Sequence, residues 1–250
     1  MRALTLNSCL ALALSVVTAT DAPAAQPFTA TYDFAQVTAA SGTTDPTPPP
    51  TATGVTFGAF TATGVSANPN ATVRFSFTSQ PLGGVNGTND FAEFTGSLNP
   101  TAYFEVALTP LSLIQLQLDT IAFSVQRSGT GIRSYAVRSS LDGYAANLPA
   151  SISPANANLS VVPGNEFRIV SDATTTAQNG STIILGSPFA GLAAPISFRF
   201  YGWNAEGSGG TFSIDNVVFS GSTDNVPEPI TTAYLLVGLT VLGIRRVAQR

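Results

Sequence analysis

Apolar and polar side chains alternate with a period of two along most of the chain, and this pattern constrains the fold more than any other feature. Phe104, Val106 and Leu108 alternate with Tyr103, Glu105 and Ala107. The same alternation occurs in five further segments, which contain Val73-Phe75-Phe77, Ile114-Leu116-Leu118, Ile121-Phe123-Val125, Ile196-Phe198-Phe200 and Phe212-Ile214. A period of two places one apolar face on each segment and is typical of half-buried β-strands.

The number and spacing of these segments predict an all-β domain. Turn residues such as Asn99-Pro100, Ser128-Gly129 and Asp142-Gly143 separate at least eight or nine strands. One polar and one apolar face per strand fits a two-sheet antiparallel sandwich, and a jelly roll is the topology we expect. An immunoglobulin-like sandwich and a β-solenoid are the alternatives, and the absence of a fixed-period repeat counts against the solenoid.

Composition limits the chemistry that this domain can perform. The chain carries a net charge of −4, has no His, and contains one Cys, Cys9. A nucleic-acid surface needs a cationic footprint, which is missing, so no nucleic-acid partner is expected. We assign residues 26–223 to the sandwich and treat residues 38–53, rich in Pro and Thr, as an exposed loop.

The N-terminus has the pattern of a removable signal peptide. Met1-Arg2 supplies a positive charge, residues 3–17 are apolar, and Ala19, Ala24 and Ala25 offer small-residue cleavage sites. We therefore assign residues 1–25 to a signal peptide, which would remove Cys9 and leave a mature protein without a thiol. We therefore expect the protein to be exported.

The C-terminus, residues 224–250, has a three-part order. Val226-Pro227-Glu228-Pro229 is followed by the uncharged segment 230–244 and then by Arg245 and Arg246. As a helix, fifteen residues would reach about 22 Å at ~1.5 Å per residue, which is short for a ~30 Å hydrocarbon core. The arginines would stay on the cytoplasmic side. The sequence therefore predicts one short transmembrane helix.

This order resembles the PEP-CTERM sorting signal of Gram-negative bacteria. The resemblance implies recognition and cleavage near Glu228 by a membrane exosortase, transient anchoring in the inner membrane, and a final place at the cell surface or in the extracellular matrix. Proteins of that family are associated with extracellular polysaccharide and biofilm. In the sandwich, residues 123–131 and 135–144, together with Tyr201-Gly202-Trp203 and Ile214-Asp215-Asn216-Val217, are similar to the β-sandwich domain often found before this tail.

The densest polar and aromatic stretch is residues 200–210. Tyr201 and Trp203 could stack on sugar rings and Asn204 could bind hydroxyl groups, provided that the glycine-rich segment exposes them. The alternative is that Trp203 caps the core at the end of a strand.

The final strand breaks its own alternation. Phe212 and Ile214 can share a face with Val217 and Phe219 only if an extra residue is inserted at Asp215-Asn216, which predicts a β-bulge. The Asp-Asn-Val pattern resembles jelly-roll carbohydrate-binding modules, and this resemblance implies that Asp215, with Asp33 if the ends of the domain pair, could hold a structural calcium. The other interpretation is a bulge without metal.

Three functions follow as hypotheses. The first is a non-enzymatic structural or adhesive surface protein, linked to exopolysaccharide, that requires no cofactor. The second is a carbohydrate-binding module with a structural calcium. The third is a glycoside hydrolase that uses two carboxylates, with Glu93, Glu105, Asp119, Glu166 and Glu206 as the candidates.

Overall fold

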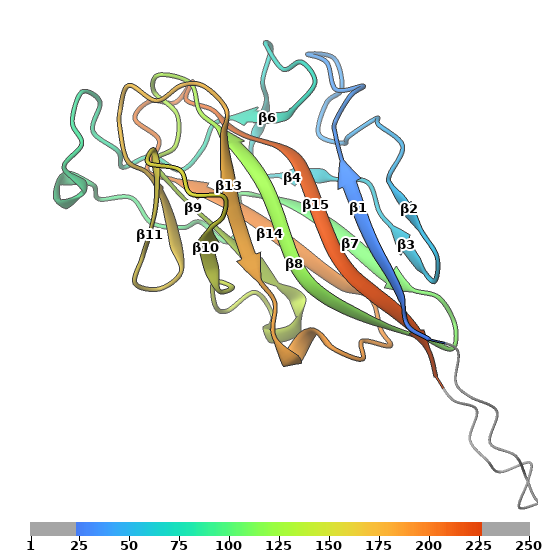
Figure 1. Cartoon of the computed structure of the whole chain (residues 1–250). Coiled ribbons are helices and arrows are strands. Elements are labelled where there is room, and N and C mark those ends of the chain that lie inside the picture. The colour runs from blue at the N-terminus through green and yellow to red at the C-terminus, as the bar shows by residue number, and fades with distance from the viewer. Residues whose placement is uncertain (1–23, 227–250) are drawn as a thin grey trace, which may run out of the picture. The chain divides into compact units, whose positions relative to one another are not determined.

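The two longest strands pair with each other and organise the domain. β8 (Ile114–Gln126) and β15 (Phe212–Asn225) are antiparallel neighbours from Asn225↔Ile114 to Ser213↔Gln126 in a computed structural model that describes residues 24–226. β1 (Gln26–Tyr32) pairs with the other edge of β15, so the first and last strands of the domain are adjacent. Figure 1 shows these three long strands side by side.

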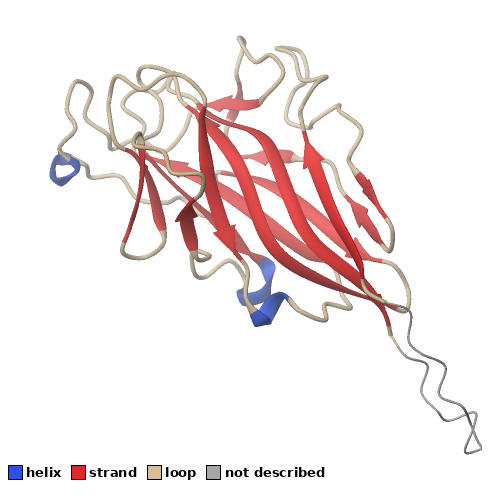
Figure 2. Ribbon diagram, viewed as in Figure 1, coloured by secondary structure: helices blue, strands red, loops and turns tan. Residues whose placement is uncertain are grey.

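Two antiparallel sheets form the sandwich, as the alternation predicts (Figure 2). The first sheet has the order β10-β13-β8-β15-β6-β5, with β1 also on β15, and its remaining strands are β10 (Ala150–Ile152), β13 (Gln178–Ile184), β6 (Phe75–Thr78) and β5 (Ser66–Ala67). The second has the order β11-β12-β9-β14-β7-β3-β2, with β4 also on β7. Its strands are β11 (Leu159–Val162), β12 (Glu166–Ile169), β9 (Ser134–Ser139), β14 (Ile196–Trp203), β7 (Tyr103–Pro110), β3 (Val55–Phe57), β2 (Thr51–Ala52) and β4 (Thr61–Thr63).

Phenylalanine rings fill the space between the sheets. Phe104 on β7 stacks on Phe212 of β15 at 4.8 Å between ring centroids, and Phe123 of β8 meets Phe200 of β14 edge to face at 5.2 Å. Each aromatic pair of this kind contributes about 0.5–1.5 kcal/mol of stability beyond that from the apolar area it buries. The apolar face of each alternating strand is therefore the core face.

Helical structure in the described part is limited to connections. Three single turns occur, η1 (Phe91–Glu93), η2 (Ser140–Asp142) and η3 (Ser187–Phe189), where the sequence predicted no helix before residue 230. Within residues 24–226 no helix is long and apolar enough to cross a membrane. The signal peptide assigned to 1–25 and the apolar segment 230–244 lie outside the described residues, except for residues 24 and 25.

One local expectation needs correction. Val73 was placed on the apolar face with Phe75 and Phe77, but β6 begins only at Phe75 and Val73 is 54% exposed. The 38–53 loop ends in the two-residue strand β2, which pairs with β3, and Thr38 and Thr44 form single bridges to Thr72 and Thr61. The loop is therefore fastened to the sandwich at several points.

Candidate functional site

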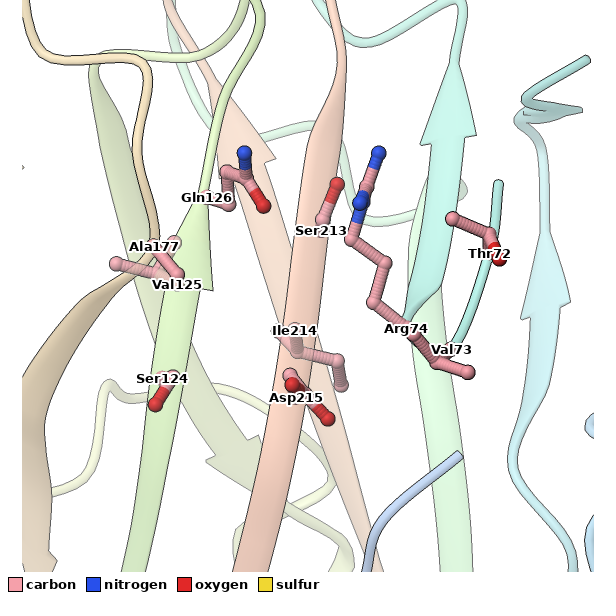
Figure 3. A pocket seen from close by; sticks show the side chains of 10 residues that line it. All are labelled: Thr72, Val73, Arg74, Ser124, Val125, Gln126, Ala177, Ser213, Ile214 and Asp215. Atoms are coloured by element: carbon pink, nitrogen blue, oxygen red, sulfur yellow. The ribbon is translucent and has the colours of Figure 1, made fainter. Parts of the chain in front are cut away.

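The outer face of the first sheet carries a polar groove, which we call the Arg74 groove. Two adjoining hollows share Arg74, Gln126 and Ser213, and the larger has a volume of ≈ 500 Å³. The larger hollow is lined by Asn68, Pro69, Asn70, Arg74, Thr78, Gln126, Arg127, Ser128, Thr175, Gly209, Thr211 and Ser213. Figure 3 shows the smaller hollow, which contains Asp215 and Ser124.

Strand register explains why polar side chains meet here. Ser213 of β15 lies opposite Gln126 of β8 on one side and Ser76 of β6 on the other. Their strand neighbours, Ile214 among them, point into the core, so this row points outward. One polar row thus crosses three strands.

The floor of the groove is fixed by hydrogen bonds between side chains. Ser76 and Ser213 lie 2.7 Å apart between their hydroxyl oxygens, and the buried Asn68 donates to Ser76 at 2.8 Å. Ser128 and Thr211 bond each other reciprocally, each backbone N–H donating to the other's hydroxyl at 2.8 and 3.0 Å. A floor held in this way is preorganised, because these side chains already have partners.

Arg74 is held at the rim by an unusual backbone. Val73 has φ +44°, a conformation that is costly for a β-branched residue. Arg74 makes one long hydrogen bond, from Nη2 to the Asn70 carbonyl at 3.5 Å, and its buried Nε has no hydrogen-bond partner among the described residues. In Figure 3 its guanidinium lies beside Ser213 and Gln126, away from Asp215.

The predicted bulge is confirmed at Asp215-Asn216. The β8–β15 register shifts between Asp215 and Val218, and Asn216 has φ +48°. Both carboxylate oxygens of Asp215 accept hydrogen bonds from Asn216, at 2.8 Å from its backbone N–H and 3.1 Å from its side chain. Burial, and further the charge of Asp33, raise the pKa of Asp215, although the Asn216 N–H and Arg74 act against them.

These residues were predicted as calcium ligands, and the structure places Asp33 near Asp215 because β1 pairs with β15. Calcium usually takes six to eight oxygen ligands. The described residues contain no group of three or more His, Cys, Asp or Glu able to hold a metal, and the Asp215 oxygens already have donors. This donor set does not fit a calcium site well.

Next to the groove lies the buried arginine cluster, formed by Arg127, Arg133, Asp172 and Glu206. Glu206 accepts from Arg127 Nη2 at 2.5 Å and from Arg133 Nη1 at 2.9 Å, and all three side chains are fully buried. Asp172 lies 3.3 and 3.4 Å from the same two arginines. Two positive and two negative groups leave the cluster without net charge.

The two acids of this cluster differ in pKa. Burial raises the pKa of Glu206, and the hydrogen bond from Arg133 reduces that effect. For Asp172 burial also acts to raise the pKa, but the neighbouring Glu206 carboxyl group and the hydrogen bond from Arg127 outweigh burial and lower the pKa. The cluster joins three connections of the chain, β8–β9, β12–β13 and β14–β15, and is a structural centre.

The residues predicted to contact sugar are buried. Tyr201 and Trp203 are 1% and 5% exposed and pack on the outer side of the second sheet against Ala136, with Leu98 and Tyr103 over them. Asn204 is also buried and donates to Ser134 at 3.1 Å. Because a stacking platform needs a free ring face, these positions correct the expectation of an exposed loop. Trp203 does not cap the core between the sheets either, because it belongs to this separate cluster on the outer side.

Three of the five carboxylates considered for hydrolysis are engaged by arginine. Glu105 bonds Arg199, Glu166 bonds Arg168 at 2.8 Å, and Glu206 belongs to the buried arginine cluster. Arg199 is also stacked between two tyrosines, 4.0 Å from the Tyr103 centroid and 3.8 Å from that of Tyr144. Glu105 and Glu166 therefore belong to stabilising pairs on the second sheet, and Glu206 to one in the β14–β15 connection.

The sorting motif lies almost wholly outside the described residues. Val226 is the last of them, and its N–H donates to the Leu113 carbonyl at 2.9 Å. Pro227, Glu228, Pro229, Arg245 and Arg246 follow it.

Sequence reasoning missed Arg74, Gln126 and the buried arginines. One signal was available: arginine is the only basic residue type in a chain with 10% charged residues. Arg127 and Arg133 flank the Ser128-Gly129-Thr130-Gly131 turn. Neither arginine belongs to the polar, solvent-facing side of an alternating strand, so their charges call for another explanation.

Comparison with known proteins adds no conclusion to the description above. No protein-family model matches the chain, and no curated protein matches it. Among solved structures, the K3 cleaved adhesin domain of Lys-gingipain from Porphyromonas gingivalis W83 is similar to it, with 15% identity and a TM-score of 0.35 over 78% of this chain and 98% of that chain. A similarity of this degree carries no conclusion about the role of this chain.

Proposed function

We propose that this protein is an exported, non-enzymatic structural or adhesive protein of the cell surface or extracellular matrix, sorted through a PEP-CTERM signal. The observation that carries the proposal is the order of Pro227-Glu228-Pro229, the uncharged segment 230–244 and the pair Arg245-Arg246. Exosortase is its processing partner, and the inner membrane holds it before cleavage. Its final environment is rich in exopolysaccharide.

The chemistry of the described residues supports a non-enzymatic role. The chain has no His, which removes the usual Ser-His-Asp arrangement. Glu105, Glu166 and Glu206 are each bonded to arginine. These carboxylates serve the fold.

Processing of the tail can be tested with a protein that carries an epitope after Arg250. Exchanging Pro227, Glu228 and Pro229 for alanine should leave the epitope attached and the protein in the membrane fraction. The unchanged protein should lose the epitope and appear at the surface or in the medium. Exchanging Pro48, Pro49 and Pro50 for alanine alters three residues outside the tail and should not affect sorting. Normal processing of the Pro227-Glu228-Pro229 variant would end the proposal.

We further infer a jelly-roll topology. Its support is the order of eight strands, β6-β15-β8-β13 in one sheet and β7-β14-β9-β12 in the other. Numbered along the chain, these are 1-8-3-6 and 2-7-4-5, so successive strands of the chain repeatedly cross between the sheets. Two Greek keys folded in this manner make a jelly roll.

The second candidate function is saccharide binding, and the Arg74 groove is the observation that favours it. Its walls consist of amide, hydroxyl and guanidinium groups on a rigid floor, which are the groups that bind sugar hydroxyls. A glycan array with the full chain tests this function. The calcium hypothesis is tested separately by a thermal melt with calcium and with chelator, where an unchanged melting temperature would remove it.

A further inference from the structure

The charge of the Arg74 groove narrows the class of ligand that it could take. Among the described residues, two arginines and no Asp or Glu line its larger hollow. Arg127 is neutralised by Glu206 and Asp172. Arg74 forms no ion pair with any described residue, so it supplies the net positive charge of this hollow.

Unused hydrogen-bonding capacity lies at the same place. The Nε atoms of Arg74 and Arg127 are both buried and have no hydrogen-bond partner among the described residues. Arg127 is 2% exposed. A buried donor without a partner costs about 1–3 kcal/mol, and more for a charged group. Of the two arginines only Arg74 is partly accessible, so a ligand with acceptor oxygens would recover this free energy there once the guanidinium turns its Nε toward the hollow.

The backbone before Arg74 points to the same residue. Val73 has φ +44° and is 54% exposed, so its conformation is not explained by burying its side chain. Strained residues that persist in a fold are concentrated at binding and catalytic sites. The strain at Val73 has the effect of setting Arg74 over the hollow.

We propose that the Arg74 groove binds an acidic saccharide, with Arg74 receiving its anionic group and the accessible amides and hydroxyls of the walls, those of Asn70, Gln126 and Thr175, binding its sugar hydroxyls. This proposal rests on the saccharide-binding function proposed above for the groove. A guanidinium binds carboxylate and sulfate groups equally through paired N–H donors, so both kinds of acidic sugar belong to this class.

The lining and volume of the larger hollow favour an acidic saccharide over other anionic ligands. Pro69 is the single apolar side chain among the lining residues of the larger hollow, so an acidic peptide would find no pocket for its apolar residues. Within residues 24–226 no aromatic side chain lines the hollow, so nucleic-acid bases would have no ring there to stack on. A volume of ≈ 500 Å³ exceeds what inorganic phosphate or sulfate fills.

Asp215 sets the direction of the ligand. It lies at the end of the smaller hollow, where its carboxylate would repel an anion. The acidic group of the saccharide therefore sits at the Gln126 end, and a neutral part of the ligand covers Asp215.

Calorimetric titration of the full chain tests the proposal with three probes: an oligogalacturonate that carries only carboxylates, a sulfated dextran oligosaccharide, and neutral maltohexaose. One or both acidic probes should bind at least tenfold more tightly than the neutral one. Their affinity should fall with increasing salt, as expected for a charge contact.

Arg74→Gln removes the charge and keeps most of the side-chain length. It should weaken binding of the acidic probe about 10- to 100-fold, while Arg74→Lys should restore part of it. Arg138→Gln, on the other sheet, removes an arginine that likewise forms no ion pair with a described residue, and it should change nothing. A melting curve of each variant confirms that the fold is kept.

The outcomes separate the two proposals. Equal affinity for neutral and acidic probes, or unchanged affinity in Arg74→Gln, would overturn the assignment of an acidic ligand and leave saccharide binding standing. If none of the three probes binds and the glycan array is also empty, the saccharide function of the groove falls with it. Tail processing is measured by the fractionation experiment and is independent of all these results.

Discussion

Arg133 donates a hydrogen bond of 2.9 Å from Nη1 to Glu206 Oε1, and both side chains are completely removed from solvent. The two residues are 73 positions apart in the chain. Arg133 also donates from Nε to the Ile169 carbonyl at 3.1 Å and from Nη2 to the Val170 carbonyl at 3.0 Å. One arginine thus ties the start of β9 to the chain after β12 and to the β14–β15 connection.

Replacing this arginine should destabilise the domain strongly. Arg133→Met keeps the length of the side chain but leaves Glu206 with one cation fewer in the interior and removes the donors to Ile169 and Val170. Breaking a buried ion pair in this way costs about 3–5 kcal/mol. Urea unfolding followed by fluorescence measures the loss.

The matched control is Arg168→Met. Arg168 pairs with Glu166 at 2.8 Å, but its side chain remains 29% exposed. Partly exposed pairs contribute about 0–1 kcal/mol. Equal losses of unfolding free energy in the two variants would show that burial of the cluster adds nothing.

The β14–β15 connection should not tolerate a methyl group at Gly210. A Cβ built there would lie 1.9 Å from the Thr130 carbonyl oxygen, whereas one built at Gly209 meets nothing within 4 Å. Gly210→Ala must move backbone, and overpacking of this kind costs about 1–3 kcal/mol or more. Gly209→Ala should unfold at nearly the same urea concentration as the unchanged protein. A Gly210→Ala variant of full stability would mean that this connection adjusts freely.

Asp215 should make stability depend on pH. Its pKa is raised in the folded state, chiefly by burial, so the folded protein holds the proton more tightly than the unfolded chain. The stabilising contribution is therefore complete below the unfolded pKa of about 4 and is lost as pH rises through the folded pKa.

Asp215→Asn removes this dependence. Its melting temperature, relative to that of the unchanged protein, should rise between pH 4 and pH 8, which differential scanning calorimetry records. Asp224→Asn makes the same change of charge at an exposed position of the same strand. A difference between Asp215→Asn and the unchanged protein that stays constant with pH contradicts the prediction.

Local pattern was enough to predict most strands, because burial of one strand face leaves a direct trace in the sequence. The alternation at Phe104, Val106 and Leu108 matches β7, and the break at Asp215-Asn216 correctly predicts the bulge. Val73 was assigned wrongly because its apolar side chain fits the alternation. Its φ of +44° belongs to a turn, and a valine in the sequence does not indicate such a turn.

The sites depend on contacts between distant segments and were harder to predict. Trp203 sits beside glycine-rich sequence, yet Leu98, about a hundred positions earlier, packs over its cluster. Arg127 and Glu206 meet across 79 positions. The Arg74 groove needs three strands in one register, and strand order is not encoded in the alternation of any single strand.

The pairing of β1 with β15 has a mechanical consequence. Gln26 lies opposite Thr223, so the chain enters and leaves the domain at one end, while Ser213 in the groove lies near the other end of β15. A pull between a ligand in the groove and the chain beyond Asn225 would run along about 40 Å of this strand, at ~3.3 Å per residue. The hydrogen bonds from β15 to β8 and β1 would then be loaded in shear, so all of them would resist the force at the same time. A pull between the two termini would instead open β1 from β15 one bond at a time, so we expect single-molecule stretching to require a much higher force in the first direction than in the second.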